Sequence, residues 1–226
     1  MRQIWAYCLG VVAVGDAVAS AVAARPGAPL GGRDRRPASE RITAGALVCI
    51  ARWGLAKTTL DDIARQAGCS RATIYRLFPG GKRAVLLATG EAELERLLAE
   101  LAVALESTST LEDLLVVAIT RSVADIRGHA ALQYLIDHEP GEVLAHVSFD
   151  ALDPLLALAT AFGQPYLARY LDPARAAATA EWVTRLIVSY GIAPGQDLAD
   201  PAVTTRFVRT FVLPGLVPAT LTNSTA

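Results

Sequence analysis

The chain has 226 residues, of which 53% are hydrophobic and 19% are charged, and its formal net charge is −1. This length suits one compact chain of two subdomains, and the apolar content is enough to bury a sizeable core, which excludes a disordered chain. Because Ala and Leu are abundant and alternating runs of Val, Ile and Thr are few, we expect an all-α fold.

The N-terminal segment is open to three interpretations. Residues 4–24 form a stretch of 21 residues with one charge, Asp16, which is about long enough to cross a membrane. Arg25 and the arginines after it would then keep the rest of the chain in the cytoplasm. Against a span stand many weakly apolar alanines and the cost of Asp16, about 2.5–3.5 kcal/mol near the bilayer centre. We therefore favour a soluble or loosely ordered extension, such as a start codon placed too early would produce, over a membrane anchor and a signal peptide.

Charge is unevenly distributed along the chain. Residues 25–90 contain 12 Lys and Arg but 4 Asp and Glu, whereas residues 91–226 contain 8 and 17. A near-neutral chain therefore combines a basic N-terminal part, net +8, with an acidic remainder, net −9. A basic surface is what binding to nucleic-acid phosphates requires.

The basic part is expected to begin with a helix over residues 39–54. Its apolar side chains recur on one side of that helix, at Ile42, Ala46, Ile50 and Trp53. We expect Trp53 to fill the core against the two helices that follow.

Residues 58–83 predict two short helices joined by a tight turn. Thr59 can cap the first helix, and Asp62 three residues later completes a capping box. Gly68 can adopt the left-handed conformation that ends this helix. Between these signals the apolar side chains fall on one face, at Leu60, Ile63, Ala64 and Ala67.

The second of these helices carries an exposed polar and aromatic face. Ser70 can cap it, and Pro79 with the glycines after it ends it. The side chains expected to point inward are Ile74, Leu77 and Phe78, and those left facing outward are Arg71, Thr73, Tyr75 and Arg76. A plain helical hairpin could show the same spacing, but the basic charge of this part favours a helix-turn-helix that reads DNA.

These residues resemble the DNA-binding domain of the Tet repressor (TetR) family of bacterial transcription regulators. The resemblance runs from about Arg41 to Leu87 and is densest in Thr58–Leu60, Asp62–Ala64, Ala67–Gly68 and Thr73–Pro79. Cys69 stands where the family usually has a small aliphatic residue, and Gly80–Gly81 replaces a more polar turn before Lys82. Export would separate such a module from DNA, which is why a signal peptide is the least favoured interpretation of residues 4–24.

The resemblance implies which side chains meet double-stranded DNA. Arg71 and Thr73 are candidates for base edges, whereas the candidates for phosphate contacts are Thr59, Tyr75, Arg76 and Lys82. Arg41 is a further candidate DNA contact. For Tyr75 the alternative is a buried ring. In the Gly- and Pro-rich stretch before the first helix, Arg33, Arg35 and Arg36 form either a minor-groove arm or a solvated linker, and the sequence does not favour one over the other.

Helix boundaries are also visible in the rest of the chain. Residues 82–106 predict a long helix and residues 111–127 an amphipathic one. Asp is a good N-cap and Pro is favoured at the first helical position, so an Asp–Pro pair predicts a helix start. Three such pairs occur, Asp153–Pro154, Asp172–Pro173 and Asp200–Pro201, and the last two are expected to open helices ending near Tyr190 and Leu213.

Those last two helices carry apolar stripes that could form a dimer surface. The first stripe consists of Ala176, Ala180, Val183 and Ile187, and the second of Val203, Phe207 and Phe211. Both stripes could instead pack inside one subunit. The resemblance implies a homodimer with a four-helix interface, which suits the two-fold symmetry of a palindromic operator.

The expected organisation has four parts: an extension over residues 1–37, a DNA-binding domain over 38–84, a regulatory and dimerisation domain over 85–216, and a tail over 217–226. The resemblance implies that a small-molecule effector binds the regulatory domain. Candidate pocket residues are Tyr134, His146, Phe149, Phe162, Tyr166 and Trp182, although each is individually more often plain core. Few polar partners accompany them, so we expect an apolar or amphipathic effector rather than a sugar or nucleotide, and the acidic charge disfavours a strongly anionic one.

Catalytic and metal sites find little support. His138–Glu139 begins like a zinc-protease signature, but Glu142 stands where the second His is needed and Pro140 would break the helix. Cys8, Cys49 and Cys69 have no metal-type spacing, so we expect reduced cytosolic thiols, no cofactor and no metal. The sequence thus predicts a cytoplasmic, ligand-responsive transcription regulator, most often a repressor. A membrane-tethered DNA-binding sensor is the competing class, and an enzyme with a helix-turn-helix appendage comes third.

Overall fold

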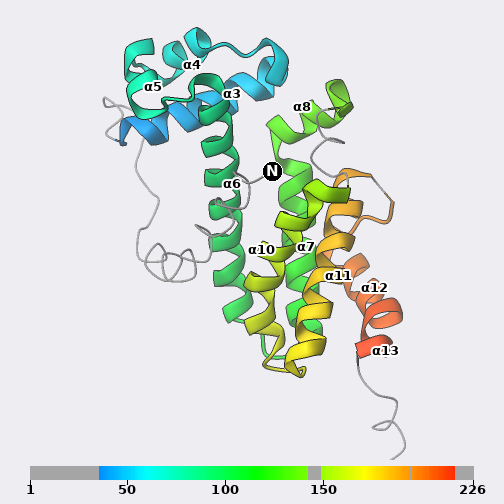
Figure 1. Cartoon of the computed structure of the whole chain (residues 1–226). Helices are drawn as coiled ribbons and strands as arrows, with labels where there is room; N and C mark the ends of the chain where they lie inside the picture. The colour runs from blue at the N-terminus through cyan, green and yellow to red at the C-terminus, as the bar shows by residue number, and fades with distance from the viewer. Residues whose placement is uncertain (1–35, 142–148, 194, 217–226) are drawn as a thin grey trace, which may run out of the picture. The chain divides into compact units, whose positions relative to one another are not determined.

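A computed structural model of the chain describes residues 36–141, 149–193 and 195–216. All regular elements in these ranges are helical, which confirms the all-α prediction (Figure 1). In chain order they are α3 (Ala38–Lys57), α4 (Leu60–Ala67), α5 (Arg71–Leu77), α6 (Gly81–Glu106), α7 (Leu111–Gly128), α8 (Ala130–His138), α10 (Phe149–Leu167), α11 (Pro173–Ile192), α12 (Pro201–Phe207), the π-helix η1 (Val208–Val212) and α13 (Leu213–Leu216).

Packing divides the chain into two units. Unit 1 comprises residues 1–99 and 128–152, so among the described helices it holds α3, α4, α5, α8 and most of α6. Unit 2 comprises residues 100–127 and 153–226, with α7, most of α10, and α11 to α13. The functional boundary expected at residue 84 is a different division, and it stays a prediction.

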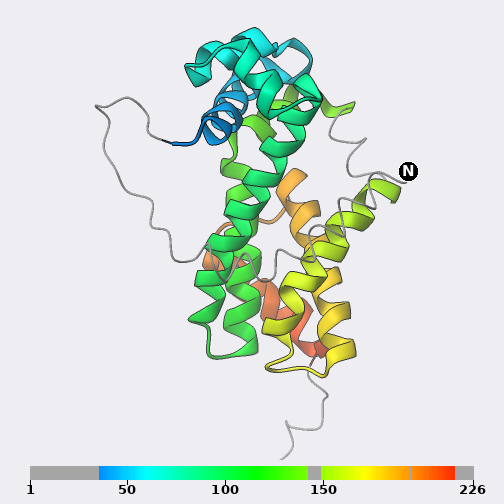
Figure 2. The same cartoon turned by 60° about the vertical axis from the view of Figure 1, so that its left-hand side comes forward.

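Unit 1 is built on the contact of α3, α4 and α5, which lie together in both views (Figures 1 and 2). The core of unit 1 contains the predicted inward residues Ile42, Ala46, Leu60, Ile63, Ala64, Ala67 and Ile74, together with Cys49 and Val85, which were not predicted. Trp53, Cys69 and Phe78 pack against this core while remaining partly exposed. Leu77, which we expected to point inward, is 37% exposed. It is the last residue of the short α5, and the side chain that follows it, Phe78, packs against the core instead.

The helix ends of unit 1 follow the local signals in the sequence. Thr59 and Asp62 form the predicted capping box at the start of α4, and Ser70 caps α5 through the Thr73 N–H. Gly68 ends α4 with φ 61°, a left-handed conformation that costs glycine little. Because both ends of the α4–α5 turn are fixed in this way, the direction of α5 is set by side chains next to it in sequence.

Unit 2 is a helical bundle with its own core. Buried side chains from α6, α7, α10, α11 and η1, with Leu198 before α12, form this core, among them Leu105, Ile119, Leu167, Val183 and Val208. Asp172 and Asp200 cap α11 and α12, each followed by Pro at the first helical positions, as predicted.

The prediction of a helix start at Asp153–Pro154 is wrong. The helix α10 begins at Phe149, so this pair lies inside it. A proline within a helix removes one N–H from the hydrogen-bond ladder. Here the helix continues through that loss, so the Asp–Pro pattern by itself does not mark a boundary.

Close packing of α7 against α11 inside unit 2 predicts a large effect of one glycine. A Cβ added at Gly191 would lie 2.8 Å from Ile126 Cγ2, so Gly191→Ala should lower the free energy of unfolding by about 1–3 kcal/mol through overpacking. At the exposed helical Gly90, no described atom lies within 4 Å of such a Cβ, and Gly90→Ala should stabilise by about 0.5–1 kcal/mol. Urea unfolding of both variants measures this. Equal effects would contradict the packing, and Ile126→Ala should partly rescue Gly191→Ala.

Candidate functional site

The outward face of α5 presents the side chains that sequence analysis assigned to DNA. Ile74 is fully buried and anchors the helix, whereas Arg71 and Arg76 are exposed and Thr73 is half-buried. The ring of Tyr75 is 44% exposed, so the alternative of a buried ring is wrong. A seven-residue helix with one anchored and one free face therefore holds four of the candidate DNA contacts.

Arg71 is held in place by two partners. Its Nη1 donates to Asp61 Oδ2 at 3.2 Å and its Nη2 donates to the Tyr75 hydroxyl at 3.3 Å. The guanidinium carbon also lies 5.6 Å from the centre of the Tyr75 ring, within cation–π range. The Tyr75 hydroxyl and, next, the Asp61 carboxylate raise the pKa of Arg71. An arginine fork oriented in advance suits bidentate recognition of guanine or phosphate.

Two other candidate cations are bonded to helix ends. Lys82 Nζ donates to Leu55 O at 2.7 Å and to Ala56 O at 3.4 Å, at the end of α3. Arg41 Nε donates to Ala67 O at 3.1 Å, at the end of α4. Cations at helix C-termini are favourable, so both residues also stabilise unit 1. Their contacts to phosphate, and those of Thr59 in its capping box, stay predictions.

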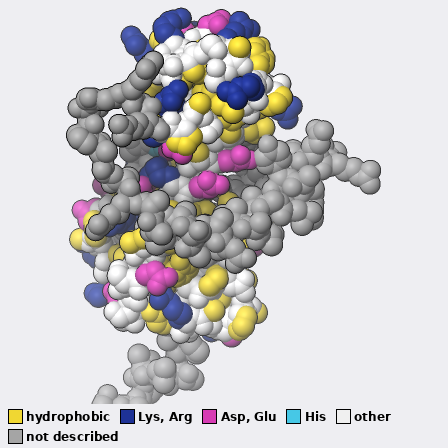
Figure 3. Space-filling view, turned by 90° about the vertical axis from the view of Figure 1, so that its left-hand side faces the viewer, with side chains coloured by type: hydrophobic (Ala, Val, Ile, Leu, Met, Phe, Trp, Pro, Cys, Tyr) yellow, Lys and Arg dark blue, Asp and Glu magenta, His cyan; other side chains and the backbone are white. Residues whose placement is uncertain are grey.

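Lys and Arg side chains lie on the surface of unit 1 around α3 to α5 (Figure 3). Arg36 lies directly before α3, and its carbonyl oxygen accepts from Arg41 Nη1 at 3.1 Å. Arg33 and Arg35 lie outside the described residues, so the structure does not test the minor-groove arm.

The candidate effector residues are spread over both units. Tyr134 belongs to unit 1, where its ring stacks on His138 with centres 4.3 Å apart. Phe162 and Tyr166 lie together on α10, with ring centres 5.5 Å apart, and Trp182 on α11 is 44% exposed. His146 and the side chain of Phe149 lie outside the described part of the chain. Of the six, the structure brings together Phe162 and Tyr166, and their role in effector binding stays a prediction.

The first stripe of the expected dimer surface lies mostly inside unit 2. Ala176, Ala180 and Val183 are buried in the core of the single chain, and their part in a dimer interface stays a prediction. Ile187, Val203 and Phe207 are partly buried against the same core. By contrast, Phe211 is 62% exposed. Helix α11 is apolar on more than one side, so its spacing alone does not tell which side faces its own core.

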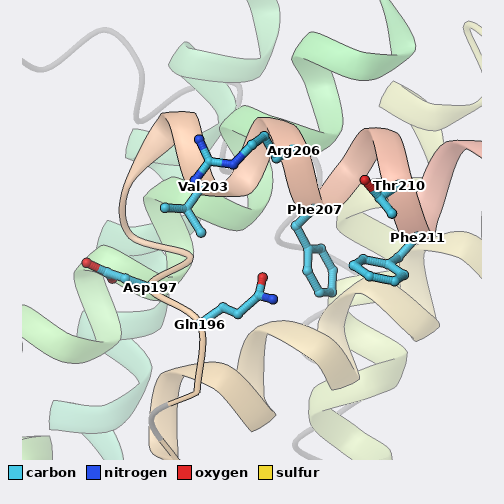
Figure 4. A pocket seen from close by; sticks show the side chains of 7 residues that line it. All are labelled: Gln196, Asp197, Val203, Arg206, Phe207, Thr210 and Phe211. Carbon is cyan, nitrogen blue, oxygen red and sulfur yellow. The ribbon is translucent and has the colours of Figure 1, made fainter.

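An open cavity of about 370 Å³ lies beside the second stripe. The rings of Phe207 and Phe211 lie next to each other, 5.3 Å apart between centres, on the side of the helix that faces Gln196 (Figure 4). Val203, Arg206, Thr210 and Asp197 complete the lining. The cavity therefore combines two aromatic rings with polar groups at its rim.

Sequence analysis missed two residues that contact the candidate site. Asp61 binds Arg71 from the neighbouring helix, a pairing that the exposed position of Asp61 at the start of α4 could have suggested. Glu139 accepts hydrogen bonds from the backbone N–H groups of Leu55 and Ala56. These contacts join residues 84 and 83 positions apart, and no local signal predicts them.

Across residues 36–141, 149–193 and 195–216, no cluster of three or more His, Cys, Asp or Glu side chains could hold a metal ion. Within these ranges no helix combines the length and apolar character that a membrane span needs. The apolar stretch over residues 4–24 lies outside them.

The family profile that matches this chain and the relative found by sequence comparison both describe regulators. Residues 42–89 match the profile of the bacterial regulatory proteins of the tetR family. The HTH-type transcriptional regulator Rv1255c of Mycobacterium tuberculosis (strain ATCC 25618 / H37Rv) is 31% identical over 193 residues, covering 84% of this chain and 91% of the relative.

Solved structures of similar fold include two regulators. The TetR family repressor AlkX from Dietzia sp. strain DQ12-45-1b, implicated in biodegradation of n-alkanes, matches with TM-score 0.59 and 18% identity over 78% of this chain and 98% of that one. The regulator FadR from Bacillus subtilis, in complex with stearoyl-CoA, matches with TM-score 0.55 and 16% identity over 76% of this chain and 97% of that one. At these identities the likeness concerns the fold.

The capping box at the start of α4 predicts a pH dependence of stability. The hydrogen bond from the Thr59 hydroxyl is the main cause that holds the pKa of Asp62 below its usual 3.8. A carboxyl with a lowered pKa in the folded state stabilises that state above its unfolded pKa, and the contribution is lost as pH falls through the folded pKa. Unfolding free energies of the wild type and Asp62→Asn should therefore differ at pH 6, and the difference should begin to shrink below about pH 4 and vanish only below the lowered folded pKa of Asp62. Thr59→Val should remove the same difference, and parallel profiles would argue against the cap.

Proposed function

Because the chain belongs to the tetR family of bacterial regulatory proteins, we propose that it is a ligand-responsive repressor that binds a palindromic operator as a homodimer. As a family member it is a transcription regulator with a helix-turn-helix and not an enzyme. The observation that carries the proposal is Arg71, which is exposed on α5 and oriented by Asp61 and Tyr75. Repression, dimerisation and the effector are the proposed parts.

In this proposal α5 lies in the major groove. Arg71 and Thr73 contact base edges, because both precede Tyr75 on the exposed face of the helix. Tyr75 and Arg76 contact the phosphates that flank the groove, together with Thr59, Arg41 and Lys82 at neighbouring helix ends. Side chains of this kind hold the protein in register, whereas base contacts provide the specificity. Arg36, with Arg33 and Arg35 before it, extends the basic surface toward the adjacent minor groove.

The dimer is proposed to form through the exposed side of α11, α12 and η1. Phe211 is 62% exposed and Trp182 is 44% exposed, both on unit 2. Aromatic side chains of this size dominate the energetics of interfaces when they are buried, and a two-fold axis would bring each patch against its own copy. The partner's side chains would then cover the cavity beside Phe207 and Phe211.

The effector is proposed to be an apolar or amphipathic molecule with a long hydrocarbon part. The fold shared with a regulator solved in complex with stearoyl-CoA supports this class. The net charge of −9 over residues 91–226 favours a free fatty acid or neutral lipid over a highly charged thioester. Titration of the operator complex with palmitate and with palmitoyl-CoA compares these two forms directly.

The operator comes first among the experiments. Selection of bound sequences from random duplex DNA should yield an inverted repeat, and Arg71→Ala should weaken binding to it by about 1–3 kcal/mol and relax its specificity. Arg121→Ala, which removes an exposed arginine from unit 2, is the matched control and should bind as the wild type does. Fluorescence anisotropy against operator and scrambled duplexes provides the measurement. An unchanged specificity ratio in Arg71→Ala would remove Arg71 from base recognition.

Dimerisation is tested independently of DNA. Phe211→Glu should shift sedimentation from dimer toward monomer, because it places a charge where the proposed interface buries a ring. Val103→Glu changes a side chain of similar exposure, 60% against 62%, on α6 of the same unit and should remain dimeric. If both variants sediment as the wild type does, the interface lies elsewhere.

A further inference from the structure

Helix α3 is kinked at Gly54, the residue at which the sequence predicts that this helix ends. Gly54 has φ 80° and ψ 177°, inside the range of a helix that runs to Lys57. Glycine adopts this conformation readily, whereas residues with a Cβ do not. Its carbonyl oxygen accepts from Thr58 N at 3.3 Å and from Thr58 Oγ1 at 2.6 Å, and Thr58 is 1% exposed. The kink is thus tied directly to the residue before Thr59, the cap of α4.

Two side chains from other helices bind every backbone polar group of the next two residues. The N–H groups of Leu55 and Ala56 donate to the two carboxylate oxygens of Glu139, at 3.0 and 3.3 Å. The carbonyl oxygens of the same residues accept from Lys82 Nζ, at 2.7 and 3.4 Å. Glu139 follows α8 and Lys82 lies at the start of α6, and all these residues belong to unit 1.

The arrangement at Glu139 is an anion site filled by the chain's own carboxylate. Successive backbone N–H groups after a turn form a concave site that attracts anions, and hydrogen bonds to an ionised carboxylate are stronger than neutral ones. A Cβ at Gly54 would lie 2.2 Å from Glu139 Oε1 and 2.8 Å from Tyr134 Cε1, so glycine is needed for this approach as well as for the kink. The Glu139 N–H donates to Leu135 O at 2.8 Å, which fixes the backbone of Glu139 to the end of α8.

We propose that Glu139 is a positioning residue for operator binding, which acts by holding the end of α3 and thereby the start of α4. The path runs from the Glu139 carboxylate to the backbone of Leu55 and Ala56, then through Thr58 to the Thr59 cap. Helix α4 in turn ends in the turn that sets the direction of α5. The inference rests on the proposed function, because positioning matters only if α5 reads DNA.

Lys82 gives this arrangement a second side. Its ammonium group donates hydrogen bonds to the carbonyl oxygens of Leu55 and Ala56, which the kink leaves without a partner in the helix. Glu139 accepts hydrogen bonds from the N–H groups of the same two residues. Loss of Glu139 therefore leaves two N–H groups without their acceptor while Lys82 still holds the carbonyl side. The turn then retains its place in the fold but loses the constraint on its direction. For this reason operator affinity should fall more than stability does.

The test combines hydrogen exchange with operator binding. In the free wild-type protein, NMR should show the Leu55 and Ala56 amides protected, and Glu139→Gln should lose protection at one or both because an amide offers a single acceptor oxygen. Glu139→Gln should weaken operator binding roughly tenfold and Glu139→Ala more, the scale expected for hydrogen bonds to a charged group. Asp137→Asn removes the same charge from an exposed position on α8 and should leave both readouts unchanged.

Each outcome decides the proposal. Binding is measured at least 15 °C below the melting temperature of every variant, so that a folding defect is not mistaken for a positioning effect. Wild-type operator affinity in both Glu139 variants would overturn the proposal, as would fast exchange of the Leu55 and Ala56 amides in the wild type. Equal loss of affinity in Asp137→Asn would assign the effect to charge and overturn it too. If the wild type selects no operator, the proposed function fails, while the exchange data still decide whether Glu139 holds the kink.

Discussion

The whole arrangement depends on the fact that α5 is too short to be stable alone. It has seven residues, whereas isolated helices shorter than about 12–15 residues are marginal in water. Its conformation must therefore come from the Ser70 cap at one end and from Ile74, fully buried in the core of unit 1. That core is supplied by α3 and α4, so anything that moves these two helices moves the exposed side chains of α5 with them.

Electrostatics adds a second constraint on the same face. Asp61 and Tyr75 restrict Arg71 before any partner arrives, which lowers the entropy that the side chain loses on binding. Asp61 also places a negative charge near the proposed path of the phosphates. Such a charge weakens binding to every duplex, whatever its sequence. The difference in affinity between sequences must then come from base recognition. The basic surface attracts DNA of any sequence. The Asp61–Arg71 pair instead favours those sequences whose bases replace Asp61 as the partner of Arg71.

The features that could be predicted from the sequence are those encoded by neighbouring residues. Thr59 with Asp62, Gly68 and Ser70 predicted the ends of α4 and α5, because caps act over three or four residues. The amphipathic faces of α3 and α4 predicted the core of unit 1 for the same reason. Contacts between distant segments could not be predicted: Glu139 reaches the kink across 84 residues, and nothing around it differs from an ordinary helix end. Which side of α11 faces the core of its own chain also depends on residues outside the helix. The apolar stripe on α11 therefore predicted that its side chains are buried, but not whether the same chain or a second chain buries them.

The π-helix after α12 has a consequence for comparing this chain with its relatives. Within η1 the Leu213 N–H bonds to Val208 O, five residues back, so this turn holds one residue more than an α-helical turn. Beside this turn the rings of Phe207 and Phe211 lie next to each other, while Val208 and Val212 are buried. A homologue with an uninterrupted α-helix here would present a different side chain at the same place in space. Alignment by sequence position would then match residues of different faces from η1 onward, and equivalences beyond Phe207 need to be assigned by structure.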